Sequence, residues 1–93
     1  MKFEWDSAKA LINLRKHGVS FEAAARAFEE DLSATFPDPD HSQGEARLIT
    51  YGLGIDGKLL VVCHTERGGT IRIFSARVAT NKERRRYESE NTK

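Results

Sequence analysis

Residues 47–78 read RLITYGLGIDGKLLVVCHTERGGTIRIFSARV and contain the strongest β-sheet pattern in the chain. Apolar side chains recur at every second position over residues 47–55, and an apolar run covers residues 59–63. The Asp56-Gly57 pair between them is a strong hairpin signal, and Gly68-Gly69 marks a second tight turn before residues 70–77. The pattern predicts a three-stranded antiparallel meander whose middle strand, apolar on both sides, is central.

The two turns also predict which side chains share a face of this sheet. If both turns have two residues, the numbers of paired residues add to 113 in the first hairpin and 137 in the second. Arg67 and Arg72 then lie on one face, opposite the more apolar face that we expect to pack on helices. The more apolar face carries Ile49, Tyr51, Leu53, Leu60, Val62, His64, Glu66, Ile71, Ile73, Ser75 and Arg77. A bulge in the second hairpin would turn one strand over relative to the next.

Upstream of the meander the sequence predicts a short strand and two helices. The strand covers residues 3–5, and Asp6 caps a helix over residues 7–17, which has apolar residues at helical spacing and ends at Gly18. Ser20 caps a second helix, in which Phe21, Ala24, Ala25 and Phe28 recur at i, i+3, i+4 and i+7.

Two further segments complete the predicted fold. Residues 34–45 contain both prolines and several Asp, Ser and Gln residues, so we interpret them as a surface loop. Thr80 and Glu83 form a Thr-x-x-Glu capping box that begins a charged helix through Tyr87 or Glu88. The predicted class is therefore α+β, with an N-terminal strand, two helices, a three-stranded antiparallel meander and a C-terminal helix.

Length and composition narrow the class of protein. Ninety-three residues with 39% apolar and 31% charged side chains predict one folded domain over residues 1–93. The sequence shows neither a signal peptide nor a membrane-spanning run, and its single cysteine, Cys63, cannot form an internal disulfide, so we expect a cytoplasmic protein.

The net charge of +1 conceals two regions of opposite sign. Residues 22–45 contain seven acidic residues and one basic residue, whereas residues 64–93 contain eight basic and four acidic residues. We expect the acidic region to face away from a polyanionic partner and the basic region to bind it. The basic region is rich in arginine, whose guanidinium fork matches phosphate oxygens. The alternative is that these arginines are solvated or pair with the protein's own acids.

Candidates for proton transfer lie in the same region. The reference pKa of a histidine lies near neutral pH and Glu66 is close to His64 in sequence, although His64 follows an apolar run and is equally explained as a hydrogen-bonded histidine at the edge of the core. We expect no cofactor and no metal site, because there is no cysteine pair and His17, His41 and His64 lie in different predicted elements.

Three blocks of the sequence resemble the BrnT family, the toxin half of BrnT/BrnA type II toxin-antitoxin modules. They are the opening FEWD-x-x-K-A-x-x-N-x-x-K-H-G-V-S-F-E-x-A, the strand LLVVCHTERG and the ending IRIFSARVAT-x-x-ERRRYE. The resemblance runs from Phe3 to Glu88, and only residues 33–45 lack a family mark. It implies a RelE-like fold, a metal-independent endoribonuclease that inhibits translation and growth, and a BrnA-like antitoxin. It also implies that operator DNA is bound only through the antitoxin complex.

The resemblance, taken together with the chemistry of the side chains, predicts which residues act in the site. Arg67, Arg72 and Arg77 are the expected phosphate binders and transition-state stabilisers, and Glu66 or His64 is the expected proton-transfer group. Weaker candidates for that role are Glu83 and Tyr87. The residues expected to contact RNA elsewhere are Arg84, Arg85, Lys16 and Tyr87. Two alternatives stay open: a non-catalytic domain that binds nucleic acid or protein, and a degenerate toxin kept for its partner contact.

Overall fold

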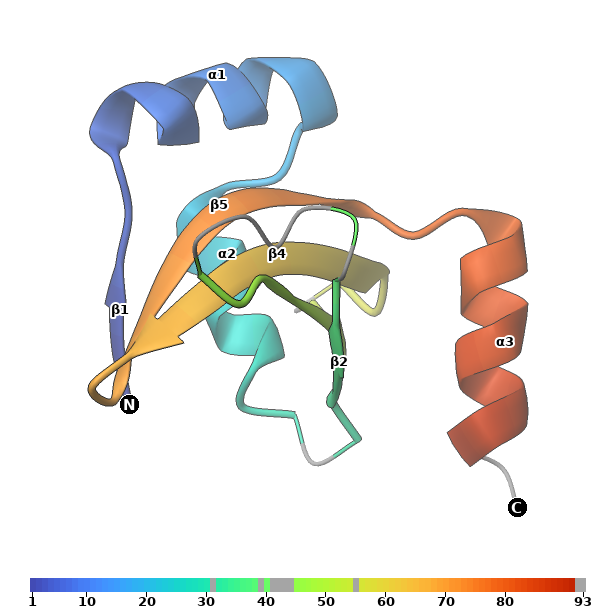
Figure 1. The fold of residues 1–93 in the computed structure, drawn as a ribbon. Coiled ribbons are helices and arrows are strands. Elements are labelled where there is room, and N and C mark those ends of the chain that lie inside the picture. The colour runs from blue at the N-terminus through green and yellow to red at the C-terminus, as the bar shows by residue number, and fades with distance from the viewer. Residues whose placement is uncertain (31, 39, 41–44, 55, 92–93) are drawn as a thin grey trace.

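A five-stranded sheet has helix α2 packed against one side, and helix α1 lies along its strand β5 (Figure 1). The computed structural model describes residues 1–30, 32–38, 40, 45–54 and 56–91. Its elements, in chain order, are β1 (Lys2–Glu4), α1 (Ser7–His17), α2 (Phe21–Ala27), β2 (Ala34–Pro37), β3 (Leu48–Leu53), β4 (Leu59–Arg67), β5 (Thr70–Val78) and α3 (Asn81–Asn91). The strand order is β1-β5-β4-β3-β2, and only the β1–β5 pair is parallel. The prediction that β4 is central is confirmed.

Local capping sets the bounds of α1 as predicted. The Asp6 carboxylate accepts hydrogen bonds from the backbone N–H groups of Ala8 (2.8 Å) and Lys9 (3.1 Å), and the helix ends at Gly18 in the left-handed region with φ 70°. The Ser20 hydroxyl likewise accepts from the Ala23 N–H at 3.0 Å and begins α2. These interactions join near neighbours, so the sequence alone predicts them.

The buried face of α1 is not its aliphatic one. Leu11, Ile12 and Leu14 are 50%, 61% and 45% exposed, whereas Asn13 is buried. The Asn13 amide donates to the carbonyls of Ala76 (2.8 Å) and Val19 (3.0 Å) and accepts from the Ala76 N–H (3.1 Å). Strand β1 pairs with β5 only at residues 70–72. Asn13 therefore provides the hydrogen-bond partners for the Ala76 backbone, at the part of the β5 edge that no strand covers.

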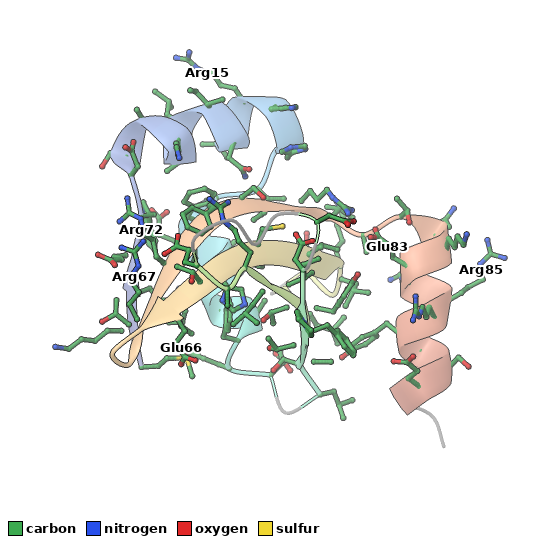
Figure 2. All side chains as sticks on the ribbon, in the orientation of Figure 1. Arg15, Glu66, Arg67, Arg72, Glu83 and Arg85 are labelled. Atoms are coloured by element: carbon green, nitrogen blue, oxygen red, sulfur yellow. The ribbon has the colours of Figure 1, made fainter. Side chains whose placement is uncertain are left out.

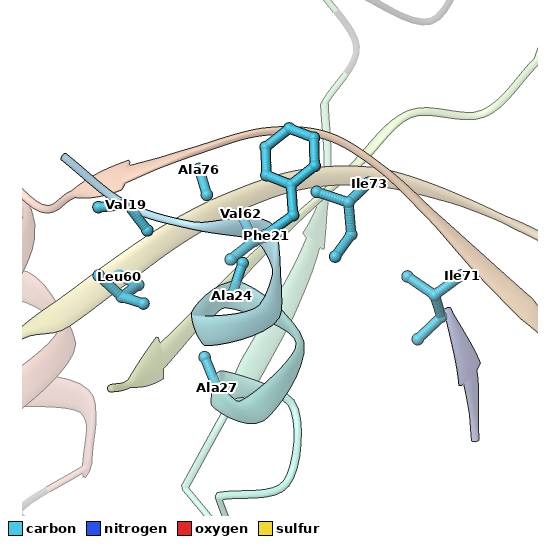
Figure 3. Close-up of a cluster of buried hydrophobic side chains, with 9 residues drawn as sticks. All are labelled: Val19, Phe21, Ala24, Ala27, Leu60, Val62, Ile71, Ile73 and Ala76. Carbon is cyan, nitrogen blue, oxygen red and sulfur yellow. The ribbon is translucent and has the colours of Figure 1, made fainter. Parts of the chain in front are cut away.

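Helix α2 packs its small residues directly against the sheet (Figure 3). Phe21, Ala24 and Ala27 are fully buried, and they meet Leu60, Val62, Ile71, Ile73 and Ala76 from β4 and β5. The approach is closest at Gly52 of β3, where a Cβ atom would lie 2.3 Å from the Ala27 carbonyl oxygen. A glycine is therefore required at this point of the sheet. We call this side of the sheet the core face.

The prediction that residues 34–45 form a loop is wrong for residues 34–37. These residues form β2, an edge strand that pairs antiparallel with β3 from Ala34–Tyr51 to Pro37–Leu48. Pro37 is tolerated there because it ends an edge strand, where a missing N–H breaks no interior ladder. Thr35 also joins β2 to the core face, since its hydroxyl lies 2.7 Å from that of Thr50.

The first hairpin differs from its predicted register by one residue. Leu53 pairs with Leu59 and Leu48 with His64, and the backbone N–H of Gly54 donates to the Lys58 carbonyl at 2.8 Å. The connection is thus one residue longer than a two-residue turn, and a one-residue slip turns every side chain of β3 over. Thr50 and Gly52 consequently lie on the core face. Ile49, Tyr51 and Leu53, which were expected to pack on the helices, lie on the opposite side, the open face.

The second hairpin starts in the predicted register and then bulges within β5. Arg67 pairs with Thr70 and His64 with Ile73, but Cys63 pairs with Ser75, so Phe74 is the extra residue. The two turn glycines have φ 52° and 85°, as a tight turn requires. Beyond the bulge, the side chains of β5 change sides. Ser75 and Arg77 lie on the open face and not on the core face, where the unbulged register placed them.

Helix α3 follows β5 and is attached mainly by polar contacts. The capping box is present: the Thr80 N–H donates to Glu83 Oε1 (2.8 Å), and the Glu83 N–H donates to the Thr80 hydroxyl (3.2 Å). The helix extends to Asn91, beyond the predicted end. The Tyr87 hydroxyl donates to the Leu32 carbonyl at 2.7 Å and joins the helix to the segment before β2.

Candidate nucleic-acid interface

The bulge in β5 brings all three predicted strand arginines to the open face. On this face Arg67 and Arg72 belong to the end of the β4–β5 hairpin next to its turn (Figure 2). Arg77 pairs with Val61, six residues before Arg67 on β4, so the two arginines are separated by roughly 20 Å along the strand. The arginines therefore form a row along the sheet and not one compact cluster.

A carboxylate contacts each of these arginines. Glu45 accepts from the Nε of Arg67 at 3.0 Å, and Glu4 lies 3.6 Å from Arg72. Each ion pair has one well-exposed side chain, Arg67 (58%) or Glu4 (45%), and a partner that is about a third exposed, so each pair stabilises the protein little. Glu45 belongs to the acidic region that was expected to face away from the basic one. That expectation is wrong for Glu45, because residues 45–47 cross the open face.

The segment 45–47 is held on the sheet by two further contacts. The Thr65 hydroxyl donates to the Ala46 carbonyl at 2.8 Å, and the Arg47 guanidinium lies 3.8 Å from the centre of the Phe74 ring. Phe74 is the bulge residue, so the same irregularity that moves Arg77 also provides the surface for this cation–π contact. The segment therefore covers the middle of the open face between the two ends of the arginine row.

The other end of the row holds the best-organised polar group. Arg77 donates to both carboxylate oxygens of Glu83, at 2.7 and 2.9 Å. The Arg77 guanidinium, together with hydrogen bonds from Thr80, lowers the pKa of Glu83 to about 2. Tyr51 lies two strands from Arg77 across β4, about 10 Å between backbones, and burial together with the charge of Glu83 raises the pKa of its phenol. At neutral pH the tyrosine is protonated and the carboxylate is ionised.

A groove of about 220 Å³ opens beside this polar group. It lies between α3 and the strands β2 and β3. The residues that line it are Phe36, Pro37, Ile49, Tyr51, Glu83, Arg86, Tyr87 and Glu90. The open face thus combines a row of arginines with a partly aromatic groove, a combination typical of surfaces that bind single-stranded nucleic acid.

His64 lies on the core face, away from the arginine row. It is 2% exposed, its Nε2 atom lies 2.7 Å from the Thr50 hydroxyl, and its ring packs edge-on against Phe28 at 4.8 Å. Burial lowers the pKa of His64 to about 4, so the imidazole is neutral at physiological pH. This geometry agrees with the alternative of a buried, hydrogen-bonded histidine, and we leave His64 out of the site proposed below.

The depressed pKa of His64 predicts a pH-dependent stability. In the unfolded chain the imidazole takes up a proton near pH 6.5, but in the folded chain it does so only near pH 4. The unfolded state thus binds more protons in this window, so stability falls as the pH drops from 6.5 to 4, by about 3 kcal/mol. Urea unfolding at several pH values measures this loss. A His64→Gln variant should lack this part of the pH dependence; an unchanged profile would contradict the prediction.

The remaining predicted residues are spread over three surfaces. Glu66 is exposed and points to the side of β4 opposite Arg67 (Figure 2). Lys16 is exposed on α1, which lies along β5. On α3, Arg84 pairs with Glu88 at 3.3 Å, whereas Arg85 is exposed and points away from the sheet in Figure 2. The structure therefore does not bring these residues together with the arginine row.

Sequence reasoning missed three residues of the open face. Tyr51 was placed in the core by the predicted register, Arg86 was not distinguished from its neighbours, and Glu45 was assigned to a loop away from the site. The available signal was the Gly-x-Gly of residues 52–54, since glycine at position 52 marks a close backbone approach and hence the buried side of β3.

Within the part of the chain that the structure describes, His, Cys, Asp and Glu side chains form no group of three that would hold a metal ion. His41 lies outside the described residues. No helix among the described segments is long and apolar enough to cross a membrane.

Comparison with known proteins agrees with the fold. The family model described as "Ribonuclease toxin, BrnT, of type II toxin-antitoxin system" matches residues 5–83. The fold is similar to the 1.1 Å crystal structure of the Brucella abortus ribonuclease toxin BrnT, with a TM-score of 0.70 and 25% identity, over 87% of this chain and 99% of that one. Comparison with curated proteins gave no match. The fold is that of a small α+β protein, and the family whose model matches is one of ribonuclease toxins. The chain belongs to the BrnT family of ribonuclease toxins of type II toxin-antitoxin systems.

Proposed function

We propose that this protein is a metal-independent endoribonuclease toxin that cleaves RNA on its open face and thereby inhibits translation and growth. The observation that carries the proposal is the bulge at Phe74, which aligns Arg67, Arg72 and Arg77 on one face of a chain from a ribonuclease toxin family. Arginines placed at a phosphodiester stabilise the charge that develops on its oxygens during cleavage.

The arrangement supports cleavage by the ribose 2′-hydroxyl. That oxygen attacks the adjacent phosphorus after losing its proton, the bond from phosphorus to the 5′-oxygen breaks, and the 5′-oxygen takes up a proton. The products are a 2′,3′-cyclic phosphate and a 5′-hydroxyl. The atoms and protons of this cleavage balance without a metal ion.

Arg77 and Glu83 have linked roles in the proposed site. Without RNA they neutralise each other, and the low pKa of Glu83 makes it a weak base. A bound phosphate competes for the Arg77 fork, and loss of that partner raises the pKa of Glu83 toward its ordinary value. Glu83 is then the base nearest the phosphate among the candidates, and Arg67 and Arg72 hold phosphates further along the strand.

The experiment is incubation of the purified protein with RNA in excess EDTA, both as free RNA and in a translating extract. Cleavage that leaves 2′,3′-cyclic phosphate ends is the expected result. Intact RNA in both arms, with protein shown to be folded by circular dichroism, would overturn the proposal. Salt-dependent RNA binding without cleavage or growth arrest would instead support a non-catalytic binding domain.

A toxin-antitoxin family implies a partner, and we propose a BrnA-like antitoxin that covers the arginine row. It would block RNA directly, and the complex would bind operator DNA only through the antitoxin. Arg67, which is exposed, and Arg72, which is half-buried, would attract an acidic antitoxin segment over a distance, because charges at the surface steer association. A short DNA-binding protein encoded beside this gene is the expected partner.

Electrostatic steering predicts a salt-dependent association rate. Raising the salt concentration from 50 to 500 mM should slow association of toxin and antitoxin about tenfold or more, because the Debye length falls severalfold. Stopped-flow measurements test this expectation, and Arg67→Gln should reduce the salt dependence while Arg15→Gln on α1 should not. A rate that does not change with salt would count against steering.

A further inference from the structure

The groove beside α3 has the size for one small ligand. Its volume of about 220 Å³ is below the range of roughly 300–1,000 Å³ typical of pockets for drug-sized molecules. It opens on the same face as Arg77, and Glu83 contributes both to its lining and to the Arg77 ion pair. A ligand in the groove is therefore next to the position proposed for the cleaved phosphate.

The walls of the groove are aromatic and partly exposed. Phe36 and Tyr51 meet edge to face with ring centres 6.0 Å apart, and Tyr87 lies across from them on α3. Phe36 is 43% exposed, so part of its ring is open to solvent. Exposed aromatic rings beside a basic row are the features on which nucleobases stack.

The rim of the groove carries a donor and an acceptor next to each other. Arg86 and Glu90 lie one turn apart on α3, with Nε and Oε1 3.7 Å apart, and more than half of each side chain is exposed. An exposed pair of this kind stabilises the helix little, so both groups are available to a ligand. Arginine offers only donors and an ionised glutamate only acceptors.

We propose that this groove binds a guanine base of the RNA, next to the phosphate at Arg77. Guanine presents adjacent N–H groups on N1 and N2 to the Glu90 carboxylate and has acceptors at O6 and N7 for Arg86. Adenine and cytosine offer a single amino group, and uracil a single N–H, so they make fewer hydrogen bonds to the carboxylate. The inference rests on the proposed function and names a determinant of its RNA sequence preference.

The direct test is binding of the four nucleoside 3′-monophosphates to the wild-type protein. Calorimetry measures the affinities, and NMR shifts of the groove residues locate the binding site. Guanosine 3′-monophosphate should bind about tenfold more tightly than the other three, since one bidentate contact provides discrimination of this order. Glu90→Gln should abolish the preference, because the amide can accept on one side only. Glu88→Gln, on the same helix and paired with Arg84, is the matched control and should leave the preference unchanged.

RNA cleavage by the same variants separates this inference from the proposed function. Cleavage by the wild type next to guanine, with the preference lost on Glu90→Gln and kept on Glu88→Gln, supports the inference. Cleavage without any guanine preference would overturn it and leave the ribonuclease proposal intact. Selective binding of guanosine 3′-monophosphate without cleavage of any RNA would support the groove and overturn the ribonuclease proposal. Equal binding of all four nucleotides would overturn the inference.

Discussion

Replacement of Arg77 by alanine is expected to lower the rate of RNA cleavage by about 10²–10³-fold, the usual loss when one preorganised donor to a developing oxyanion is removed. Arg77 is the only one of the three strand arginines whose fork is shown engaging both oxygens of one carboxylate, the geometry that a phosphate would also accept. Arg67→Ala, at the far end of the row, should weaken RNA binding and cause a smaller loss.

Two controls separate chemistry from stability in this experiment. Arg15→Ala removes an exposed arginine from α1, outside the open face (Figure 2), and should leave cleavage unchanged. Arg77→Lys keeps the charge but not the fork, so it should retain only part of the activity. Single-turnover rates of folded variants measure the effect. Full activity of Arg77→Ala would place the cleaved phosphate elsewhere on the protein.

Asn13→Ala is expected to lower the free energy of unfolding by about 3 kcal/mol, because it leaves buried backbone groups of Ala76 and Val19 without their hydrogen-bond partners. The loss is large for a small domain, whose total stability is typically about 5–15 kcal/mol. The side chain acts as a substitute for a strand at the open edge of β5, and an alanine cannot take that role.

The neighbouring residue supplies the matched control for Asn13. Ile12 is 61% exposed on the same helix, so Ile12→Ala should change stability by no more than about 0.5 kcal/mol, despite removing a larger apolar side chain. Urea denaturation of both variants compares them under one set of conditions. A loss at Ile12 equal to that at Asn13 would contradict the burial described here.

The sequence correctly predicted those elements whose boundaries depend on near neighbours. Helix α1 is capped by Asp6 and Gly18, and α3 begins with the Thr80–Glu83 box, because in each case the capping groups lie within a few residues of the backbone atoms that they bind. The central position of β4 was predictable as well, since a strand that is apolar on both sides must be covered on both sides.

The predicted faces of the sheet were wrong in two strands, for reasons that a local pattern does not contain. One extra residue between Gly54 and Lys58 turned β3 over, and the bulge at Phe74 turned over the second half of β5. The first change is consistent with α2, which approaches so closely that only Gly52 fits beneath Ala27. Strand β2 was missed because its pairing with β3 depends on a partner far along the chain.

The candidate site was likewise predictable from the sequence only in part. By itself, the sequence determined the α+β class, the capped helices, the family and the wealth of arginine in the second half. Only the tertiary structure decided that Arg67, Arg72 and Arg77 share a face, that His64 is buried and that Tyr51 lines a groove. The physical reason is that side chains in a strand alternate with a period of two, so one inserted residue, fixed by distant packing, exchanges inside and outside.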